Sequence, residues 1–151
     1  EIAEDILKKI PKNFDMEYAS KKHPIKFEDS MNTVLQQELL RYNNLTSVVR
    51  SSLINVGKAI KGEVPLSLEL EELCTSLTNN QVPEIWHKRA FPSLKPLASW
   101  VLDFLKRLKF CDSWVEEGAP NSFWVSGFFF TQSFFTGSKQ NYARKYVIAI
   151  D

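Results

Sequence analysis

The residues of this sequence that could cradle a phosphate group lie between 57 and 62, where the chain reads GKAIKG. A phosphate-binding loop of the GxxxxGK[ST] type uses its backbone amides to bind phosphate ahead of a helix. Here the glycines and lysines come in the wrong order, and the segment lies inside a predicted helix. The sequence therefore predicts no nucleotide site and no ATP or Mg²⁺ bound by these residues.

The residues that could bind a metal or act as nucleophiles are equally scattered. A zinc site needs four closely arranged Cys or His ligands, whereas His23, Cys74, His87 and Cys111 lie on separate predicted elements without paired spacing. Cys74 and His87 lack a glycine-rich turn that would supply an oxyanion hole, and Ser126 lacks the G-x-S-x-G pattern. We expect free thiols, surface imidazoles, no metal, no cofactor and no catalytic residue, so the protein is not expected to be an enzyme.

Charge indicates neither nucleic acid nor a membrane surface as a partner. The chain has 19 basic and 18 acidic residues, a net charge of +1, so binding to a polyanion would gain little from counterion release. Four basic pairs could flank stacking aromatic rings, but solvated helix ends are the favoured interpretation. These pairs are Lys21-Lys22, Lys88-Arg89, Lys106-Arg107 and Arg144-Lys145.

The stretch FWVSGFFFTQSFFTG at 123–137 places seven aromatic side chains in fifteen positions. Each ring buries about 150 to 250 Å² when covered, and soluble monomers seldom expose apolar patches beyond a few hundred Å². Polar residues interrupt the run well before the roughly 18 apolar residues that a membrane-spanning helix needs. We therefore expect other parts of the protein to cover these rings.

One long helix must organise the fold. Apolar residues from Met31 to Ile60 recur every three or four positions, which predicts a helix over Ser30 to Lys61 with Ser30 as its N-cap and Gly62 after its end. Its opposite face carries polar residues, either facing water, as we favour, or forming a contact surface for another module. They are Gln36, Arg41, Asn43, Arg50 and Lys58.

The remaining segments predict a mainly α fold, a multi-helix bundle organised on that long helix in a single domain over 1–151. A proline-interrupted connector at 12–30 is expected to hold one helical turn after Asp15. The other expected elements are helices at 2–10, 67–80, 93–110 with a brief continuation through Trp114, and 131–145 capped by Thr131, an extended segment at 123–130, and a strand at 146–151. The sequence is expected to be a piece of a longer protein, with that strand either frayed or paired with a second copy.

Four runs of the sequence closely resemble the C-terminal region of dynein heavy chains. They are MNTVLQQELLRYNNL at 31–45, SLINVGKAIKGEVPLS at 52–67, PSLKPLASWVLDFLKRLKF at 92–110 and FWVSGFFFTQSFFTGSKQNYARK at 123–145. They come in the family's order, and the resemblance covers nearly the whole sequence. Thr131 directly follows the phenylalanine triplet, and in this feature the sequence resembles the axonemal heavy chains of the inner-arm type.

The resemblance implies a part of an ATP-driven, minus-end-directed microtubule motor of cilia and flagella, located in the cytoplasm, the cytoskeleton and the axoneme. In that family this region follows the sixth AAA+ module, packs as helices across one face of the motor ring and leads into a small β-barrel, which is missing here. ATP, Mg²⁺ and microtubules bind to other parts of the heavy chain. The expected partners are therefore the AAA+ modules and the β-barrel of the same heavy chain, with no nucleic acid and no membrane.

The resemblance also suggests structural roles for individual residues. Seven aromatic residues are expected to form a knot between the helices and the barrel: Trp100, Trp114, Phe123, Trp124, Phe128, Phe129 and Phe130. Asn141, Tyr142 and Arg144 are expected to give the last helix a polar end. These three residues are also the candidates for contacts with other modules, together with Gln36, Arg41, Asn43 and Arg50 of the long helix.

Two alternatives belong to other classes of protein. A stand-alone helical adaptor would bind a partner helix in an apolar groove. An enzymatic interpretation would require ATP turnover by these 151 residues alone.

Overall fold

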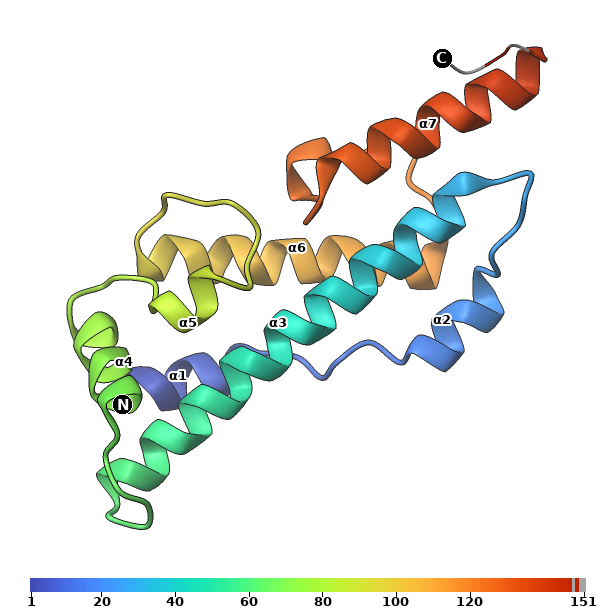
Figure 1. Ribbon diagram of the computed structural model, residues 1–151. Coiled ribbons are helices and arrows are strands. Elements are labelled where there is room, and N and C mark those ends of the chain that lie inside the picture. Colours follow the sequence, from blue (N-terminus) through green and yellow to red (C-terminus); the bar gives the residue numbers. More distant parts are fainter. Residues whose placement is uncertain (148, 150–151) are drawn as a thin grey trace. The chain divides into compact units, whose positions relative to one another are not determined.

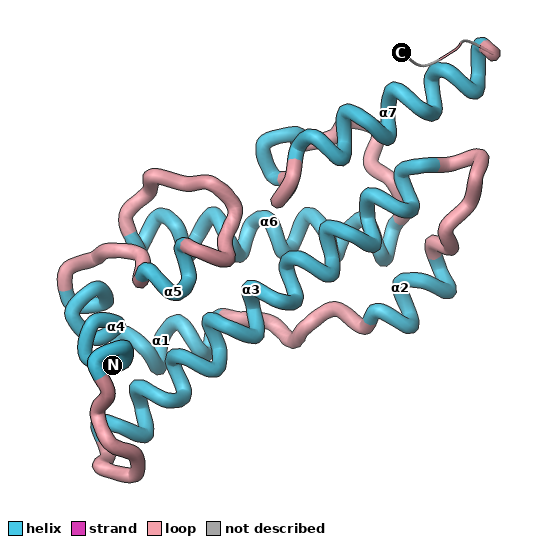
Figure 2. Tube along the Cα trace, in the orientation of Figure 1, coloured by secondary structure: helices cyan, strands magenta, loops and turns pink. Residues whose placement is uncertain are grey.

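The protein is helical in the computed structural model, which describes residues 1–147 and residue 149. Its α-helices are α1 (Ile2–Lys9), α2 (Met16–Lys22), α3 (Ser30–Ile60), α4 (Leu68–Thr78), α5 (Glu84–His87), α6 (Leu97–Glu117) and α7 (Thr131–Tyr146). A short 3₁₀ helix, η1, spans Val125–Gly127. The described residues contain no strand (Figures 1 and 2), and the predicted mainly α, multi-helix fold is confirmed.

The helices divide between two compact units. Unit 1 consists of Glu1–Asn13 and Asn43–Lys106, and unit 2 consists of Phe14–Tyr42 and Arg107–Asp151. Both α3 and α6 contribute residues to each unit. The apolar stripe of α3 is buried as predicted, since Leu35 and Leu39 in unit 2 and Leu45, Val49 and Leu53 in unit 1 are fully enclosed.

The core of unit 1 contains buried residues of α1, α4, α5, the later part of α3 and the first part of α6. Arg50 of α3 fastens the segment that follows α1, because its guanidinium donates to the Pro11 carbonyl at 2.6 Å and to Asn13 Oδ1 at 2.8 Å. Trp86 of α5 is fully buried, and its Nε1 donates to the Ser52 hydroxyl at 2.7 Å. The short helix α5 was not predicted, because four residues are too few to show a helical period.

The capping residues predicted from the sequence mark some helix ends correctly, but not all of them. Ser67 caps α4 as predicted by accepting the Leu70 amide. At the end of α3, Gly62 has a φ of 77°, and the Glu63 amide bonds back to the Lys58 carbonyl, a Schellman arrangement that favours glycine. Ser30, however, is the first residue of α3 and not its cap, since the Met31 amide donates to the Asp29 carboxylate.

Two predicted boundaries were wrong. Helix α6 begins at Leu97 rather than at residue 93, because Pro96 occupies the position before the first turn, and Leu94 is fully exposed. The predicted continuation through Trp114 is confirmed, since α6 runs without a break to Glu117. Helix α2 extends for seven residues, with Asp15 capping it through a bond from the Tyr18 amide.

The C-terminal predictions need further correction. Residues 123–130 are not fully extended, because η1 interrupts them. Thr131 is the first residue of α7, and the residue before it, Phe130, offers no capping side chain. Tyr146 ends α7 and is not part of a strand, while Val147 follows in a left-handed conformation with φ of 52°. The rest of the predicted strand includes Ile148, Ile150 and Asp151, which lie outside the described residues.

In unit 2, α2 supplies a positive group that the end of α6 lacks. The last turn of α6 has no basic residue of its own. Lys22 Nζ donates to the Glu116 carbonyl at 2.7 Å, and the His23 ring nitrogen Nε2 lies 2.9 Å from the Val115 carbonyl oxygen. Cations near a helix C-terminus are stabilising, so Lys22 also interacts favourably with the helix dipole.

No helix in the described part of the protein combines the length and the apolar content needed to cross a bilayer.

Candidate functional site, a polar clamp on the aromatic segment

A buried carboxylate organises the segment that leads into α7. Glu38 lies on α3 among apolar residues and is only 1% exposed. Its Oε2 accepts the Phe129 amide at 2.6 Å and its Oε1 accepts the Phe130 amide at 3.1 Å. These amides belong to the two residues that precede α7, so Glu38 holds the backbone that leads into the helix from a distant part of the sequence. A negative charge near a helix N-terminus is also favourable.

Tyr42 and Arg107 bind the same segment from the carbonyl side. The Tyr42 hydroxyl donates to the Gly127 carbonyl at 2.6 Å. Arg107 Nη1 donates to the Phe128 carbonyl at 3.2 Å and reaches the Tyr42 hydroxyl at 3.4 Å. We call Glu38, Tyr42 and Arg107 the polar clamp. It binds the backbone of four consecutive residues, 127–130.

Burial controls the ionisation of the groups in and beside the clamp. Burial raises the pKa of Glu38, and the amides of Phe130 and Phe129 and the charges of Arg41 and Arg107 oppose that shift. Burial likewise raises the pKa of the Tyr42 hydroxyl and of the neighbouring Cys111 thiol. At neutral pH Tyr42 is thus a neutral hydrogen-bond donor, and Cys111 is a thiol rather than a nucleophilic thiolate.

Gly127 allows the clamped segment to fold tightly. A Cβ atom at this position would lie 2.3 Å from Cε3 of Trp124, much closer than non-bonded carbon atoms approach one another. The segment therefore needs glycine for the close contact with the Trp124 ring rather than for an unusual backbone angle.

The rings of the segment pack with aromatic residues of α6 and α7. Trp114 lies 5.1 Å from Phe123 and 5.9 Å from Phe128, measured between ring centroids. Trp124 lies perpendicular to Phe110 at 6.0 Å, and Phe134 contacts Phe128 at 4.9 Å. Four residues proposed for the knot, Trp114, Phe123, Trp124 and Phe128, thus share one cluster in unit 2. Phe110 and Phe134 belong to it too, although no sequence signal distinguished them from other aromatic residues.

The other proposed knot residues occupy different surroundings. Phe129 packs edge-on against Tyr42 at 5.3 Å, and Phe130 is 48% exposed with the Arg41 guanidinium 5.0 Å from its ring centroid. Trp100 belongs to unit 1. There it stacks on Phe91 at 5.5 Å and contacts Trp86 and Phe104. A role of any of these residues in contacting a barrel stays a prediction.

Asn141 and Arg144 of α7 bind the first turn of α3. Asn141 Oδ1 accepts the Ser30 amide at 2.9 Å, and Arg144 Nη1 donates to the Ser30 hydroxyl at 2.7 Å. The Arg144 guanidinium also lies 4.6 Å from the centroid of the Phe27 ring, a cation–π contact. The polar groups of these two residues are thus used within unit 2.

The remaining candidates for inter-module contact differ in how accessible they are. Gln36 donates to the His23 carbonyl, Arg41 pairs with Glu38 at 3.5 Å, and Arg50 is bound as described above. Asn43 is half-buried and also interacts within the protein. Tyr142 is 60% exposed, its ring 4.6 Å from that of Tyr146. Contacts of these residues with other modules stay a prediction.

Sequence reasoning identified none of the three clamp residues as functional groups. Arg107 was assigned to a solvated helix end, but α6 continues to Glu117, so Arg107 lies in mid-helix and is only 8% exposed. Glu38 follows Leu35 by three positions and precedes Tyr42 by four, which places it on the buried stripe. That spacing was the available signal.

Other potentially reactive groups lie apart from the clamp. Cys74 and Cys111 are free thiols, as expected, and His23 is half-buried rather than at the surface. Among the described residues, no three His, Cys, Asp or Glu side chains gather in an arrangement that could hold a metal ion. What the clamp does is bind backbone amides and carbonyls.

The whole sequence matches one protein family. Residues 1–151 match the family model for the C-terminal domain of the dynein heavy chain. The sequence is 56% identical over all 151 residues to dynein axonemal heavy chain 1 of Rattus norvegicus and to dynein axonemal heavy chain 3 of Homo sapiens, and 55% identical to dynein axonemal heavy chain 12 of Mus musculus. It spans 3%, 4% and 5% of the lengths of these relatives, respectively.

Proposed function

Since the protein belongs to the dynein heavy chains and matches their C-terminal domain from end to end, we propose that it is a structural and regulatory module of an axonemal dynein, of the inner-arm type. The parent protein would be an ATP-driven, minus-end-directed microtubule motor that moves cilia and flagella. The match over residues 1–151 is the observation that carries this proposal. The module would work in the axoneme, within the cytoskeleton and cytoplasm of the cell.

We assign the module a mechanical role rather than a catalytic one. The parent's ATP, Mg²⁺ and microtubules would bind to other parts of the heavy chain, and the module would pack its helices on the AAA+ ring and continue into the β-barrel. The polar clamp supports this role, because its buried ionisable groups are bound to the module's own backbone. Nucleic acid and membranes are not among the partners we propose.

The test uses the complete heavy chain with its motor ring. Lysine-reactive cross-linking followed by mass spectrometry should join exposed lysines of this module, such as Lys58, Lys61 and Lys109, to AAA+ modules of the same heavy chain. Removing the module should leave nucleotide binding intact but change the microtubule-stimulated ATPase rate. A heavy chain that shows no such cross-links and an unchanged ATPase rate without the module would contradict the proposal.

The match with the family across the entire sequence favours this module over a stand-alone adaptor.

A further inference from the structure

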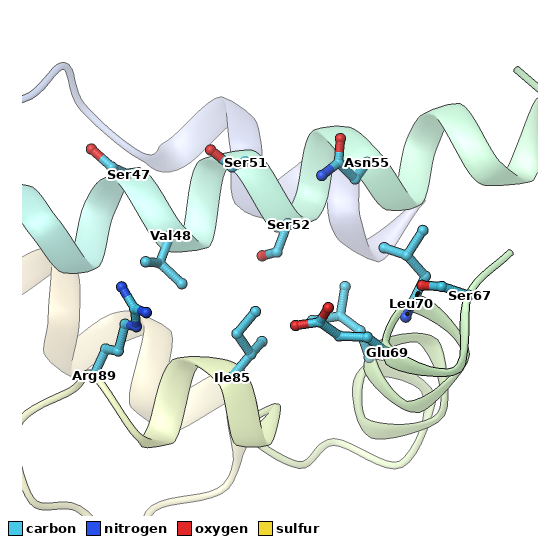
Figure 3. Close-up of a pocket in the computed structure, with 11 residues that line it drawn as sticks. Ser47, Val48, Ser51, Ser52, Asn55, Ser67, Glu69, Leu70, Ile85 and Arg89 are labelled. Atoms are coloured by element: carbon cyan, nitrogen blue, oxygen red, sulfur yellow. Dashed lines mark hydrogen bonds between the residues drawn. The ribbon is translucent and has the colours of Figure 1, made fainter. Parts of the chain in front are cut away.

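A pocket of about 460 Å³ opens in unit 1 among α3, α4 and α5. It belongs to neither the clamp nor the aromatic cluster. Figure 3 shows Val48 and Ser52 of α3, Ile85 of α5 and Leu70 of α4 around the hollow. Pockets that hold ligands have volumes of about 300 to 1,000 Å³. The space is thus large enough for side chains of a bound segment.

The apolar lining of the pocket is incompletely covered. Val48, Leu70 and Ile85 are each half-buried, while Leu73, which also lines the pocket, is buried. The rim is polar and exposed, and includes Ser47, Ser51, Asn55 and Ser67. An apolar floor within a polar rim is the usual anatomy of a site that binds another polypeptide segment.

Two opposite charges face this pocket without a partner. The Glu69 carboxylate points into the hollow from α4, and the Arg89 guanidinium reaches toward it from the residues just after α5 (Figure 3). Neither side chain forms an ion pair or a side-chain hydrogen bond with another described residue. Ser52, by contrast, is already bound to the Val49 carbonyl and to Trp86. The charges available to a ligand are therefore those of Glu69 and Arg89.

We propose that this pocket receives a segment of the same heavy chain, from outside these 151 residues, that carries an apolar anchor side chain flanked by an acidic and a basic residue. The anchor lies on Val48, Leu70 and Ile85. The acidic residue pairs with Arg89 and the basic residue pairs with Glu69.

The length of the relatives supports an occupant from the same polypeptide. At least 95% of each relative named above lies outside the region matched here, because the coverage is 5% or less. A covalently attached segment binds intramolecularly, so it does not have to be supplied at high concentration by a separate partner. This inference rests on the proposed function, and it specifies one contact through which the module docks.

The test places a photoreactive benzoylphenylalanine at Ser51, an exposed rim position, in the complete heavy chain. Illumination should cross-link it to one peptide of the same heavy chain that contains an apolar residue beside acidic and basic ones. Arg89→Glu should lower the cross-link yield at least fivefold. The matched control, Lys88→Glu, reverses the charge of the neighbouring exposed residue, which does not line the pocket, and should change the yield less than twofold.

Several outcomes would overturn the proposal. They are the absence of any cross-link, a yield insensitive to Arg89→Glu, a cross-link to a different polypeptide, or, in a mixture of unlabelled and ¹⁵N-labelled heavy chains, a cross-link between two copies. If the lysine cross-links to the AAA+ modules persist while the Ser51 position yields none, the assignment of the pocket is wrong and the proposed function stands. If both kinds of cross-link are missing, both proposals are wrong.

Discussion

Glu38 accepts the Phe129 amide at 2.6 Å across 91 residues of sequence, and its second carboxylate oxygen accepts the next amide. One buried side chain of α3 thereby holds the backbone that enters α7. An N-terminal cap is normally supplied by the residue just before the helix, and Phe130 has no group that can serve. The start of α7 thus depends on tertiary structure rather than on its own sequence.

Replacing Glu38 by Leu should destabilise the protein by about 1 to 3 kcal/mol, because the amides of Phe129 and Phe130 both lose their acceptor. Urea unfolding, followed by circular dichroism, measures the change in the free energy of unfolding. Glu72→Leu makes the same change at an exposed position and should cost less than about 0.5 kcal/mol. Equal effects of the two substitutions would show that Glu38 does not hold the backbone that leads into α7.

The pH dependence of stability should report on the same carboxylate. Burial raises the pKa of Glu38 in the folded state above its value of about 4.3 in the unfolded state. Between these two values the folded state binds more protons than the unfolded state. The stabilisation from Glu38 is therefore fully present below the unfolded pKa and is lost as pH rises through the folded pKa.

Urea unfolding of the native protein and of Glu38→Gln across pH 3.5 to 7.5 measures this effect, because the Gln amide does not titrate. The difference in stability between the native protein and the variant should fall as pH rises, and then level off. A difference that grows with pH would mean that the bound amides and Arg41 and Arg107 outweigh burial, and that the folded pKa of Glu38 is depressed.

The sequence predicted the elements whose signals are local. The apolar period from Met31 to Ile60 located α3, Ser67 located the start of α4, and Gly62 marked the end of α3. These signals work because backbone dihedral angles and side-chain periodicity are determined within a few residues. Helix α5 lacked such a signal, and Pro96 moved the start of α6 by its steric effect on the preceding residues.

The candidate site was harder to predict because its contacts are distant in sequence. Composition indicated that the aromatic rings are covered, yet the partition of Trp100 into unit 1 and Trp114 into unit 2 depends on tertiary packing. Arg107 looked like a surface cation because charged residues are rarely buried unless they are paired. Only the fold reveals that the Phe128 carbonyl and the Tyr42 hydroxyl accept its bonds.

Truncating Leu45 to Ala should destabilise the protein by about 2 to 5 kcal/mol, because the side chain is fully buried in α3 and its loss leaves a cavity. Leu40 lies on the same helix but is 53% exposed, so Leu40→Ala should cost well under half as much. The midpoint of urea unfolding distinguishes the two variants. Similar midpoints would mean that the buried stripe of α3 has been assigned to the wrong face.

Two glycine substitutions should change stability in opposite directions. In Gly127→Ala, the new methyl group would lie 2.3 Å from Cε3 of Trp124, so the indole ring must move away from its contacts with Phe110 and Arg107. Overpacking of this kind costs about 1 to 3 kcal/mol. Gly57 lies inside α3 with no atom within 4 Å of an added Cβ, so Gly57→Ala should stabilise the protein by about 0.5 to 1 kcal/mol through helix propensity. Thermal unfolding of both variants, together with the fluorescence of the tryptophans, provides the measurement. A Gly127→Ala variant that is as stable as the native protein and has an unchanged emission spectrum would show that Trp124 does not occupy the space beside residue 127.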